Sequence, residues 1–232
     1  MEENQTEHPA ERIIDTLTGP WEKKVLRKLA LALPPKVVPD HLTILGLFST
    51  LVIAAGYCLT WYSPYWLFLA SFGFILNWYA DSLDGTLARV RKIERERYGY
   101  FVDHICDAWS TVIMCLALGI SPLMQMELGM LLAIGYLLLN IYAHIGAYTK
   151  AEFRISFLKF GPTEIRIVII IFNTVICFWN PKIWLSAQNY LTFYDLGAIF
   201  FSVVFFIIFM WNSVKTAIVL DKLDRAQKRE GQ

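Results

Sequence analysis

The sequence has little net charge and no paired cysteines. Its 232 residues include 21 lysines and arginines against 20 aspartates and glutamates, a formal net charge of +1. A near-neutral chain lacks the broad basic surface that nucleic-acid binding requires, so we expect no nucleic-acid partner. No CxxC pair is present, which excludes a zinc-type spacing or a disulfide framework. We expect the four cysteines to be small buried hydrophobic side chains: Cys58, Cys106, Cys115 and Cys177.

The beginning of the sequence has no pattern of a cleavable signal peptide. Residues 1–12, MEENQTEHPAER, are polar and acidic, whereas a signal peptide carries a positive segment and an apolar core. We therefore expect the first membrane helix to act as its own insertion signal. Internal repeats and low-complexity tracts are also absent from the sequence.

Long apolar segments are abundant. Hydrophobic residues make up 56% of the chain, including 8 Trp, 16 Phe and 11 Tyr, which is typical of an integral membrane protein. No charged residue occurs from Leu42 to Ala80, a stretch too long for one helix because a bilayer core takes about 20 helical residues. Trp61-Tyr62-Ser63-Pro64, an aromatic pair followed by a helix-starting proline, divides this stretch in two.

Four further apolar stretches follow, so the fold class we predict is an all-α integral membrane protein with six membrane helices. Ser121-Pro122 marks a turn after the third helix, and Asn180-Pro181 marks the end of the fifth. The predicted membrane helices cover residues 42–61, 64–90, 98–120, 126–149, 163–180 and 191–216.

The positive charges lie on one side of this topology. The N-terminal arm holds six lysines and arginines, the loop after the second helix five, the loop after the fourth helix four, and the tail five. Lys182 is the remaining one of the 21 and falls on the other side. Because cytoplasmic loops carry the excess of lysine and arginine, this asymmetry predicts that both termini are cytoplasmic.

A basic, amphipathic segment precedes the first membrane helix. Residues 21–35, WEKKVLRKLALALPP, place an apolar stripe beside a basic face and end at two prolines. They predict a juxtamembrane helix lying on the inner leaflet; the alternative is a short helix packed on the protein's own cytoplasmic face. The stripe consists of Val25, Leu26, Leu29 and Leu33, and the basic face of Lys23, Lys24, Arg27 and Lys28. We thus expect a cytoplasmic arm (1–41), a six-helix membrane domain that carries the candidate site (42–216) and a cytoplasmic tail (217–232).

Four aspartates stand where the second and third membrane helices reach the cytoplasmic surface. Asp81 and Asp84 are three residues apart and Asp103 and Asp107 four, so each pair shares one helix face. The second helix would be ~40 Å long, longer than the ~30 Å hydrocarbon core, so its last turns reach the inner boundary. The third helix enters from the same boundary, and we expect the four carboxylates to converge.

Converging carboxylates repel one another unless cations lie between them. Hard divalent cations prefer carboxylate oxygens, and Mg²⁺ with retained water suits a phosphate substrate. Two bridged ions would form a two-metal site in which one carboxylate acts as general base.

Small residues and an arginine accompany the aspartates. Gly85, Ala88 and Gly99 leave bare helix surface on which a phosphorylated ligand can approach the backbone, and Arg89 can bind a phosphate through two parallel hydrogen bonds. A glycine in a membrane helix is more often a packing contact, and an isolated aspartate pair is often a cap or a solvated group. Both pairs together with these residues favour phosphoryl transfer.

The pattern Asp81-x-x-Asp84-Gly85-x-x-Ala88-Arg89, then Gly99-x-x-x-Asp103-x-x-x-Asp107, resembles the signature of the CDP-alcohol phosphotransferase (CDP-alcohol phosphatidyltransferase) family. All eight positions match, and the six-helix topology extends the resemblance over most of the chain. The intervening loop, Val90–Tyr98, is one residue longer than in the usual form of the pattern.

The resemblance implies a homodimer of six-helix protomers that uses CDP-linked substrates and two divalent ions, Mg²⁺ or Mn²⁺, at a site facing the cytoplasm. It assigns metal binding to Asp81, Asp84, Asp103 and Asp107, with Asp107 also the base acting on the acceptor hydroxyl. It assigns the cytidine diphosphate to Gly85, Ala88, Arg89 and Gly99.

Residues at two other places extend the candidate site. PDHLT at 39–43 resembles the family's Pro-Asn-x-x-Thr motif, which adds Thr43 as a nucleotide contact and leaves Asp40 as either a helix cap or a nucleotide contact. Charged residues after the fourth helix border the same cytoplasmic mouth: Lys150, Glu152, Arg154, Glu164 and Arg166. Glu164 and Arg166 are candidates for acceptor recognition, although this segment, including Gly161 and Thr163, can also simply start the fifth helix.

The sequence therefore predicts a membrane enzyme of phospholipid synthesis that releases CMP. The compact chain favours transfer of a phosphatidyl group from CDP-diacylglycerol to a polar alcohol. Transfer of a CDP-linked headgroup to a lipid alcohol such as diacylglycerol is the alternative, because no acceptor signature is present. From another class, a divalent-cation transporter would also place acidic residues at membrane depth, but all four carboxylates lie at one face of the membrane.

Overall fold

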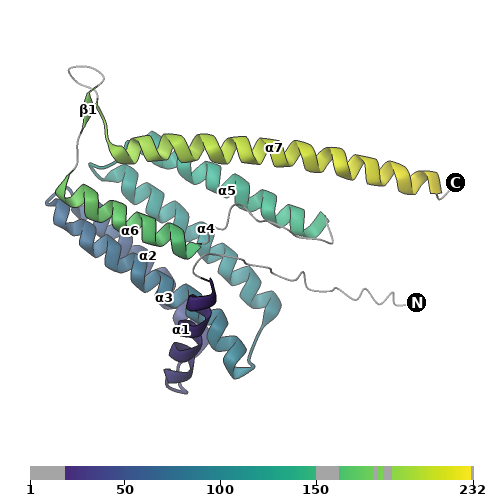
Figure 1. The fold of residues 1–232 in the computed structure, drawn as a ribbon, viewed down its shortest axis with the longest axis horizontal. Coiled ribbons are helices and arrows are strands. Elements are labelled where there is room, and N and C mark those ends of the chain that lie inside the picture. Colours follow the sequence, from purple (N-terminus) through teal and green to yellow (C-terminus); the bar gives the residue numbers. More distant parts are fainter. Residues whose placement is uncertain (1–18, 150–161, 180–181, 185–189, 231–232) are drawn as a thin grey trace.

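The computed structural model describes residues 19–149, 162–179, 182–184 and 190–230, and these residues form a bundle of long helices (Figure 1). A short two-stranded hairpin precedes the last helix, and its strands are antiparallel. The elements in order are α1 (Gly19–Ala32), α2 (Pro39–Leu59), the 3₁₀ turn η1 (Pro64–Trp66), α3 (Leu67–Arg91), α4 (Glu96–Ile120), α5 (Met126–Thr149), α6 (Pro162–Phe178), β1 (Ile183–Trp184), β2 (Tyr190–Leu191) and α7 (Phe193–Glu230).

The all-α class is confirmed, and each of the helices α2 to α7 overlaps one of the six predicted membrane segments. Four of these helices are long and apolar enough to cross a membrane: Pro39–Leu59, Glu96–Ile120, Met126–Gly146 and Phe193–Ala226. Of the other two, α6 has 17 residues and α3 carries charged side chains in its last turns. The structure thus supports four spans by length and composition.

Local sequence explains the differences in helix boundaries. Pro39 starts α2 three residues earlier than predicted, at a position where a missing backbone N–H is tolerated. Pro64–Trp66 forms a 3₁₀ turn before α3 begins at Leu67, and the side chain of its capping residue, Ser63, accepts a hydrogen bond from the Tyr65 backbone N–H. At the other end, Lys92 adopts a left-handed conformation that terminates α3.

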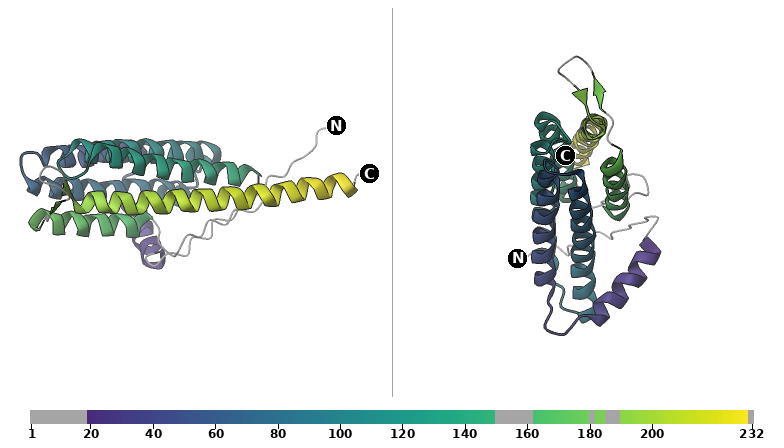
Figure 2. Two further views of the ribbon diagram at one scale, coloured as in Figure 1. Left: turned by 90° about the horizontal axis from the view of Figure 1, so that it is seen from above. Right: turned by 90° about the vertical axis from the view of Figure 1, so that its left-hand side faces the viewer.

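The last helix differs most from its predicted range. α7 runs for 38 residues, continues through residue 216 into the predicted tail, and extends past the other helices (Figure 2). Tyr142 of α5 hydrogen-bonds to Thr216 of α7 at 2.8 Å. The boundary expected between the membrane domain and the tail is therefore not a break in the helix.

Glycines allow α2 and α3 to approach closely. A Cβ at Gly56 would lie 2.4 Å from the Ala70 nitrogen, and one at Gly73 would lie 2.6 Å from Cγ1 of Ile53. Both distances are far below van der Waals contact, so these glycines serve helix packing, as small residues do in membrane bundles.

Asn173 joins four helices inside the bundle. Its Oδ1 accepts hydrogen bonds from the hydroxyls of Tyr57 (3.3 Å) and Tyr194 (2.6 Å), and its Nδ2 donates to Ser71 Oγ at 3.3 Å. Because all four side chains are buried, these bonds pair polar groups that would be costly if left unsatisfied. They fix α6 between α2, α3 and α7.

Asp195 is a buried capping group at the opposite end of α7 from the tail. It is 1% exposed, and its carboxylate accepts hydrogen bonds from the backbone N–H groups of Gln125 (2.8 Å) and Thr192 (2.9 Å). This acidic residue therefore has a structural explanation apart from the four aspartates.

The predicted amphipathic segment forms α1, which packs against α3 (Figure 1). Leu26 and Ala30 are buried in a cluster with Leu83 and Leu87 of α3. The four basic side chains of α1 are exposed. The described contacts thus match the alternative of a helix packed on the protein itself, while contact of α1 with the inner leaflet stays a prediction.

Candidate active site

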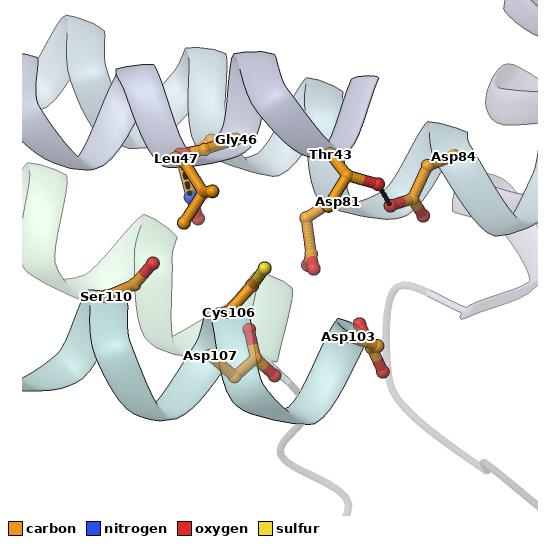
Figure 3. A pocket seen from close by; sticks show the side chains of 10 residues that line it. Thr43, Gly46, Leu47, Asp81, Asp84, Asp103, Cys106, Asp107 and Ser110 are labelled. Carbon is orange, nitrogen blue, oxygen red and sulfur yellow. Dashed lines mark hydrogen bonds between the residues drawn. The ribbon is translucent and has the colours of Figure 1, made fainter. Parts of the chain in front are cut away.

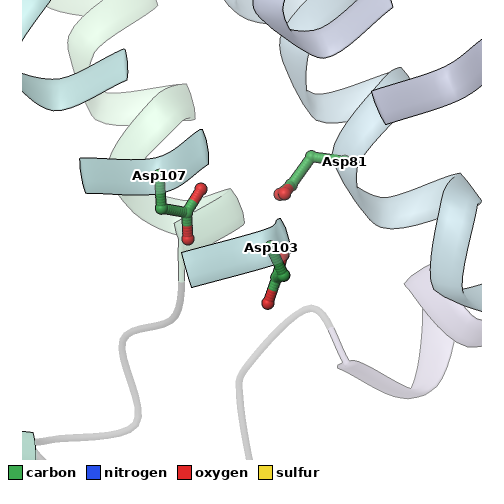
Figure 4. Close-up of side chains that lie close together, drawn as sticks. All are labelled: Asp81, Asp103 and Asp107. Atoms are coloured by element: carbon green, nitrogen blue, oxygen red, sulfur yellow. The ribbon is translucent and has the colours of Figure 1, made fainter. Parts of the chain in front are cut away.

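Three of the four aspartates meet between α3 and α4 (Figure 4). Asp81 comes from α3, and Asp103 and Asp107 lie one turn apart on α4. One carboxylate oxygen from each lies within 4.8 Å of the others, and all three residues are partly buried. The predicted convergence of two helix faces is present for this group, which we call the carboxylate triad.

Asp84 lies in the same pocket but outside the triad (Figure 3). Its Oδ2 accepts a hydrogen bond from Thr43 Oγ1 of α2 at 3.1 Å, and its Oδ1 accepts one from the Gly85 backbone N–H at 2.5 Å. Thr43 is thus placed at the candidate site through Asp84.

The pocket is formed by three helices, α2, α3 and α4. Three of its polar side chains, Asn77, Cys106 and Ser110, were not predicted as site residues. Asn77 lies one turn before Asp81 and donates to the Gly46 carbonyl at 3.4 Å, while Ser110 accepts a hydrogen bond from Thr50 at 2.9 Å. Their helical spacing from the aspartates was the available signal. The full lining is Thr43, Gly46, Leu47, Asn77, Asp81, Asp84, Asp103, Cys106, Asp107 and Ser110.

Arg166 of α6 is a cation that contacts the triad. Its Nη2 lies 2.8 Å from Asp81 Oδ2, and the two side chains are 14% and 27% exposed. A guanidinium in this position offsets part of the repulsion among the carboxylates. The structure therefore brings Arg166, which was expected at the cytoplasmic mouth as a candidate for acceptor recognition, into direct contact with a predicted metal-binding residue.

The glycines of the signature differ from the packing glycines. Among the described residues, a Cβ at Gly99 would meet nothing within 4 Å, and the atoms nearest to a Cβ at Gly85 would belong to the guanidinium of Arg89, at 3.5 Å or more. Helix packing therefore does not require glycine at either position. Ala88 of α3 is partly buried. The exposed Arg89, also of α3, donates a hydrogen bond to Thr86 Oγ1 at 3.3 Å. These residues flank the pocket along α3 and α4 without lining it.

Asp40 does not cap α2. The capping position is Val38, and Asp40 lies in the first turn, where it forms an ion pair with Arg95 of the α3–α4 connection. Arg95 also stacks on the Tyr98 ring, 4.1 Å from its centroid. Of the candidates that follow α5, Glu164 is buried. The others lie outside the described residues: Lys150, Glu152, Arg154 and Gly161.

The chemistry of the triad suits a hard cation. All three donors are carboxylate oxygens on two adjacent helices, and such oxygens are the ligands that Mg²⁺ and Mn²⁺ prefer. Among the described residues, the triad is the one group of three or more acidic, histidine or cysteine side chains that lie close enough together to share an ion. The residues present therefore fit a divalent metal.

The fold and site together define a membrane protein with an acidic centre at one end of its helices. A family model described as CDP-alcohol phosphatidyltransferase matches residues 36–219, so the chain belongs to that family. The match includes the whole signature from Asp81 to Asp107, and with several apolar helices it supports an integral membrane protein.

Curated relatives share part of this chain. Cholinephosphotransferase 1 of Bos taurus and that of Homo sapiens are each 28% identical over 160 residues, which cover 66% of this chain and 39% of the relative. Cholinephosphotransferase 1 of Gallus gallus is 28% identical over 177 residues, 73% of this chain and 52% of the relative. The chain thus spans about two fifths to one half of the relatives' length.

Proposed function

We propose that this protein transfers a substituted phosphate group from a CDP-linked donor to an alcohol and releases CMP. The carboxylate triad on α3 and α4, inside the family signature, is the observation that carries the proposal. Two further findings support it: the signature glycines are not needed for packing, and a guanidinium lies beside the carboxylates.

The reaction is an in-line displacement at phosphorus. The acceptor hydroxyl oxygen forms a bond to the phosphorus that bears the lipid or headgroup. The bond from that phosphorus to the bridging oxygen of the diphosphate breaks, and CMP leaves with the electron pair. In our proposal Asp107 accepts the hydroxyl proton, because the resemblance assigns it the role of base and its carboxylate belongs to the triad.

Divalent ions, Mg²⁺ or Mn²⁺ and two in number as the family resemblance implies, would neutralise charge on the diphosphate at this site. We propose that Asp81, Asp84, Asp103 and Asp107 hold them. Asp84, which accepts its hydrogen bond from Thr43, would then keep Thr43 near the donor.

The signature residues on the flanks of the pocket would bind the nucleotide. Gly85, Ala88 and Gly99 expose helix backbone to a ligand, and Arg89 supplies a cation for phosphate. Open space at Gly99 supports this assignment, because a Cβ added there would meet no atom of the described residues within 4 Å.

Two donor classes remain within the proposed reaction. The first is CDP-diacylglycerol with a polar alcohol, the donor that we predicted from the sequence. The name of the curated relatives, cholinephosphotransferase, instead favours a CDP-linked headgroup donated to a lipid alcohol such as diacylglycerol. An assay with each CDP compound identifies the donor of this protein, because only the true donor yields both CMP and a lipid product.

The membrane arrangement is part of the proposal. We propose that α3 and α6 complete six spans, with a juxtamembrane α1, both termini and the site in the cytoplasm, a tail from residue 217, and a homodimer as the assembly. Cysteine accessibility from each side of sealed vesicles tests the orientation, and chemical crosslinking in native membranes tests the dimer.

CMP release is the test of the reaction. Purified protein in vesicles would be given each donor class, a panel of alcohols and Mg²⁺, with Asp107→Asn as the inactive variant. Asp224→Asn, an exposed carboxylate near the end of α7, is the matched control. CMP and a new phosphodiester lipid identified by mass spectrometry support the proposal. Metal uptake into the vesicles without CMP would support a transporter instead.

A further inference from the structure

Glu22 of α1 contacts two other helices through a single oxygen. Its Oε1 accepts hydrogen bonds from Trp78 Nε1 (2.8 Å) and Ser82 Oγ (3.3 Å) of α3, and from Thr163 Oγ1 of α6 (2.7 Å). Hydrogen bonds to an ionised carboxylate are shorter and stronger than those between neutral groups. Glu22 therefore fastens α3 and α6 to each other as well as to α1.

These contacts lie next to the candidate active site. Ser82 follows Asp81 directly, and Thr163 precedes Arg166 by three residues, so Thr163 and Arg166 share one face of α6. The Arg166–Asp81 pair joins the same two helices about one helical turn further along. At this end, α6 is thus connected to α3 by two adjacent polar contacts, one through Glu22 and one through the Arg166–Asp81 pair.

The rest of α6 is held elsewhere. Asn173, about two turns beyond Arg166, bonds to Ser71, Tyr57 and Tyr194. A helix fixed at one point can still tilt at its other end. The contact of Thr163 with Glu22 restricts that tilt at the end that presents Arg166 to the triad.

We infer that Glu22 is a positioning residue for the proposed reaction: it holds α6 against α3 so that Arg166 meets Asp81 in the triad. This inference rests on the proposed function. It assigns to the N-terminal helix a part in setting the active-site geometry, in addition to its apolar packing through Leu26 and Ala30.

The test compares Glu22→Ala, Glu22→Gln and Thr163→Val with the control Glu94→Gln, an exposed carboxylate in the α3–α4 connection. CMP release and amide hydrogen exchange of the whole protein in vesicles are measured on the same samples. Glu22→Ala should lower kcat about tenfold, the effect expected when a charge-assisted hydrogen bond is lost. Glu22→Gln keeps an accepting oxygen and should retain most of the activity.

Hydrogen exchange reports geometry independently of catalysis. Exchange in residues 162–170 should be faster in Glu22→Ala and Thr163→Val, and unchanged in Glu94→Gln. In an Arg166→Gln background, Glu22→Ala should cause no further loss of kcat, because the arginine that it positions is already absent. A merely stabilising role would lower the melting temperature and leave kcat per folded molecule unchanged.

Unchanged exchange in 162–170 overturns the inference, as does an equal loss of kcat with and without Arg166. If the wild-type protein releases no CMP from any donor, the proposed function fails while the exchange measurement still reports whether Glu22 holds α6.

Discussion

Arg166 Nη2 lies 2.8 Å from Asp81 Oδ2, although 85 residues separate the two in the chain. The contact joins α6 to α3 at the point where Asp81 meets Asp103 and Asp107. One cation from a distant helix is therefore part of an acidic centre that otherwise comes from two consecutive helices. The electrostatic balance of the centre depends on α6 as well as on the signature.

Replacing Arg166 should change metal binding and turnover in opposite directions. Arg166→Gln removes a cation beside Asp81, so Mn²⁺ should bind more tightly, roughly fivefold for a change of about 1 kcal/mol in binding free energy. CMP release should fall, because Asp81 loses the side chain that it pairs with in the triad. Arg166→Lys keeps the charge and should stay close to wild type in metal affinity. Mn²⁺-dependent thermal shifts measure the affinities, and weaker binding by Arg166→Gln would contradict the assigned role.

Asp107→Asn should remove the proton acceptor without unfolding the protein. The amide has nearly the same shape, and general-base catalysis contributes about 10²- to 10⁴-fold, so CMP release should fall by that factor. The melting temperature of the purified variant and the activity of Asp224→Asn provide the controls. Near-normal turnover in Asp107→Asn would show that another group accepts the proton.

Chelation should abolish activity and lower stability together. A ligand at 100 times its Kd stabilises the folded state by about 2.7 kcal/mol, so Mn²⁺ should raise the melting temperature of the wild-type protein. The shift should disappear in Asp103→Asn, which removes one of the three carboxylates of the triad. Activity that persists in excess chelator would contradict a metal-dependent centre.

Two glycine substitutions should separate ligand contact from helix packing. Gly99→Leu adds a side chain in open space, so it should raise the KM for the CDP-linked donor at least several-fold with little change in stability. Gly73→Ala places a methyl group 2.6 Å from Ile53 and should destabilise the protein, typically by about 1–3 kcal/mol for overpacking. Thermal melts and donor titrations distinguish the two, and an unfolded Gly99→Leu would show that this glycine serves packing after all.

The helices were predictable because their determinants are local. The charge-free stretch, the Ser63-Pro64 break and the spacing of the aspartates all act within a few turns, and the structure has long helices in all six predicted segments. The continuation of α7 past residue 216 was missed because its charged end resembles a soluble tail, while helix propensity continues across the boundary.

The site was predictable only in part. Helical periodicity brought Asp103 and Asp107 to one face, and antiparallel neighbours brought Asp81 opposite them. Periodicity could not show that Asp84 accepts a hydrogen bond from Thr43 or that Thr163 contacts Glu22. The residues of these two pairs are 41 and 141 positions apart in the sequence, and the packing of different helices decides both contacts. The Asp40 cap was not found because Pro39 moved the start of α2.

The stoichiometry of CMP and lipid product under a Mn²⁺ titration shows whether the carboxylate triad is the centre of a transfer reaction. Purified protein in vesicles is supplied with a CDP-linked donor and its alcohol, and both products are quantified in the wild type and in Asp103→Asn. We expect equal amounts of CMP and phosphodiester lipid, formed only with metal and only by the wild type. Equal product formation by Asp103→Asn, or CMP without lipid product, would contradict a transfer centre built on these carboxylates.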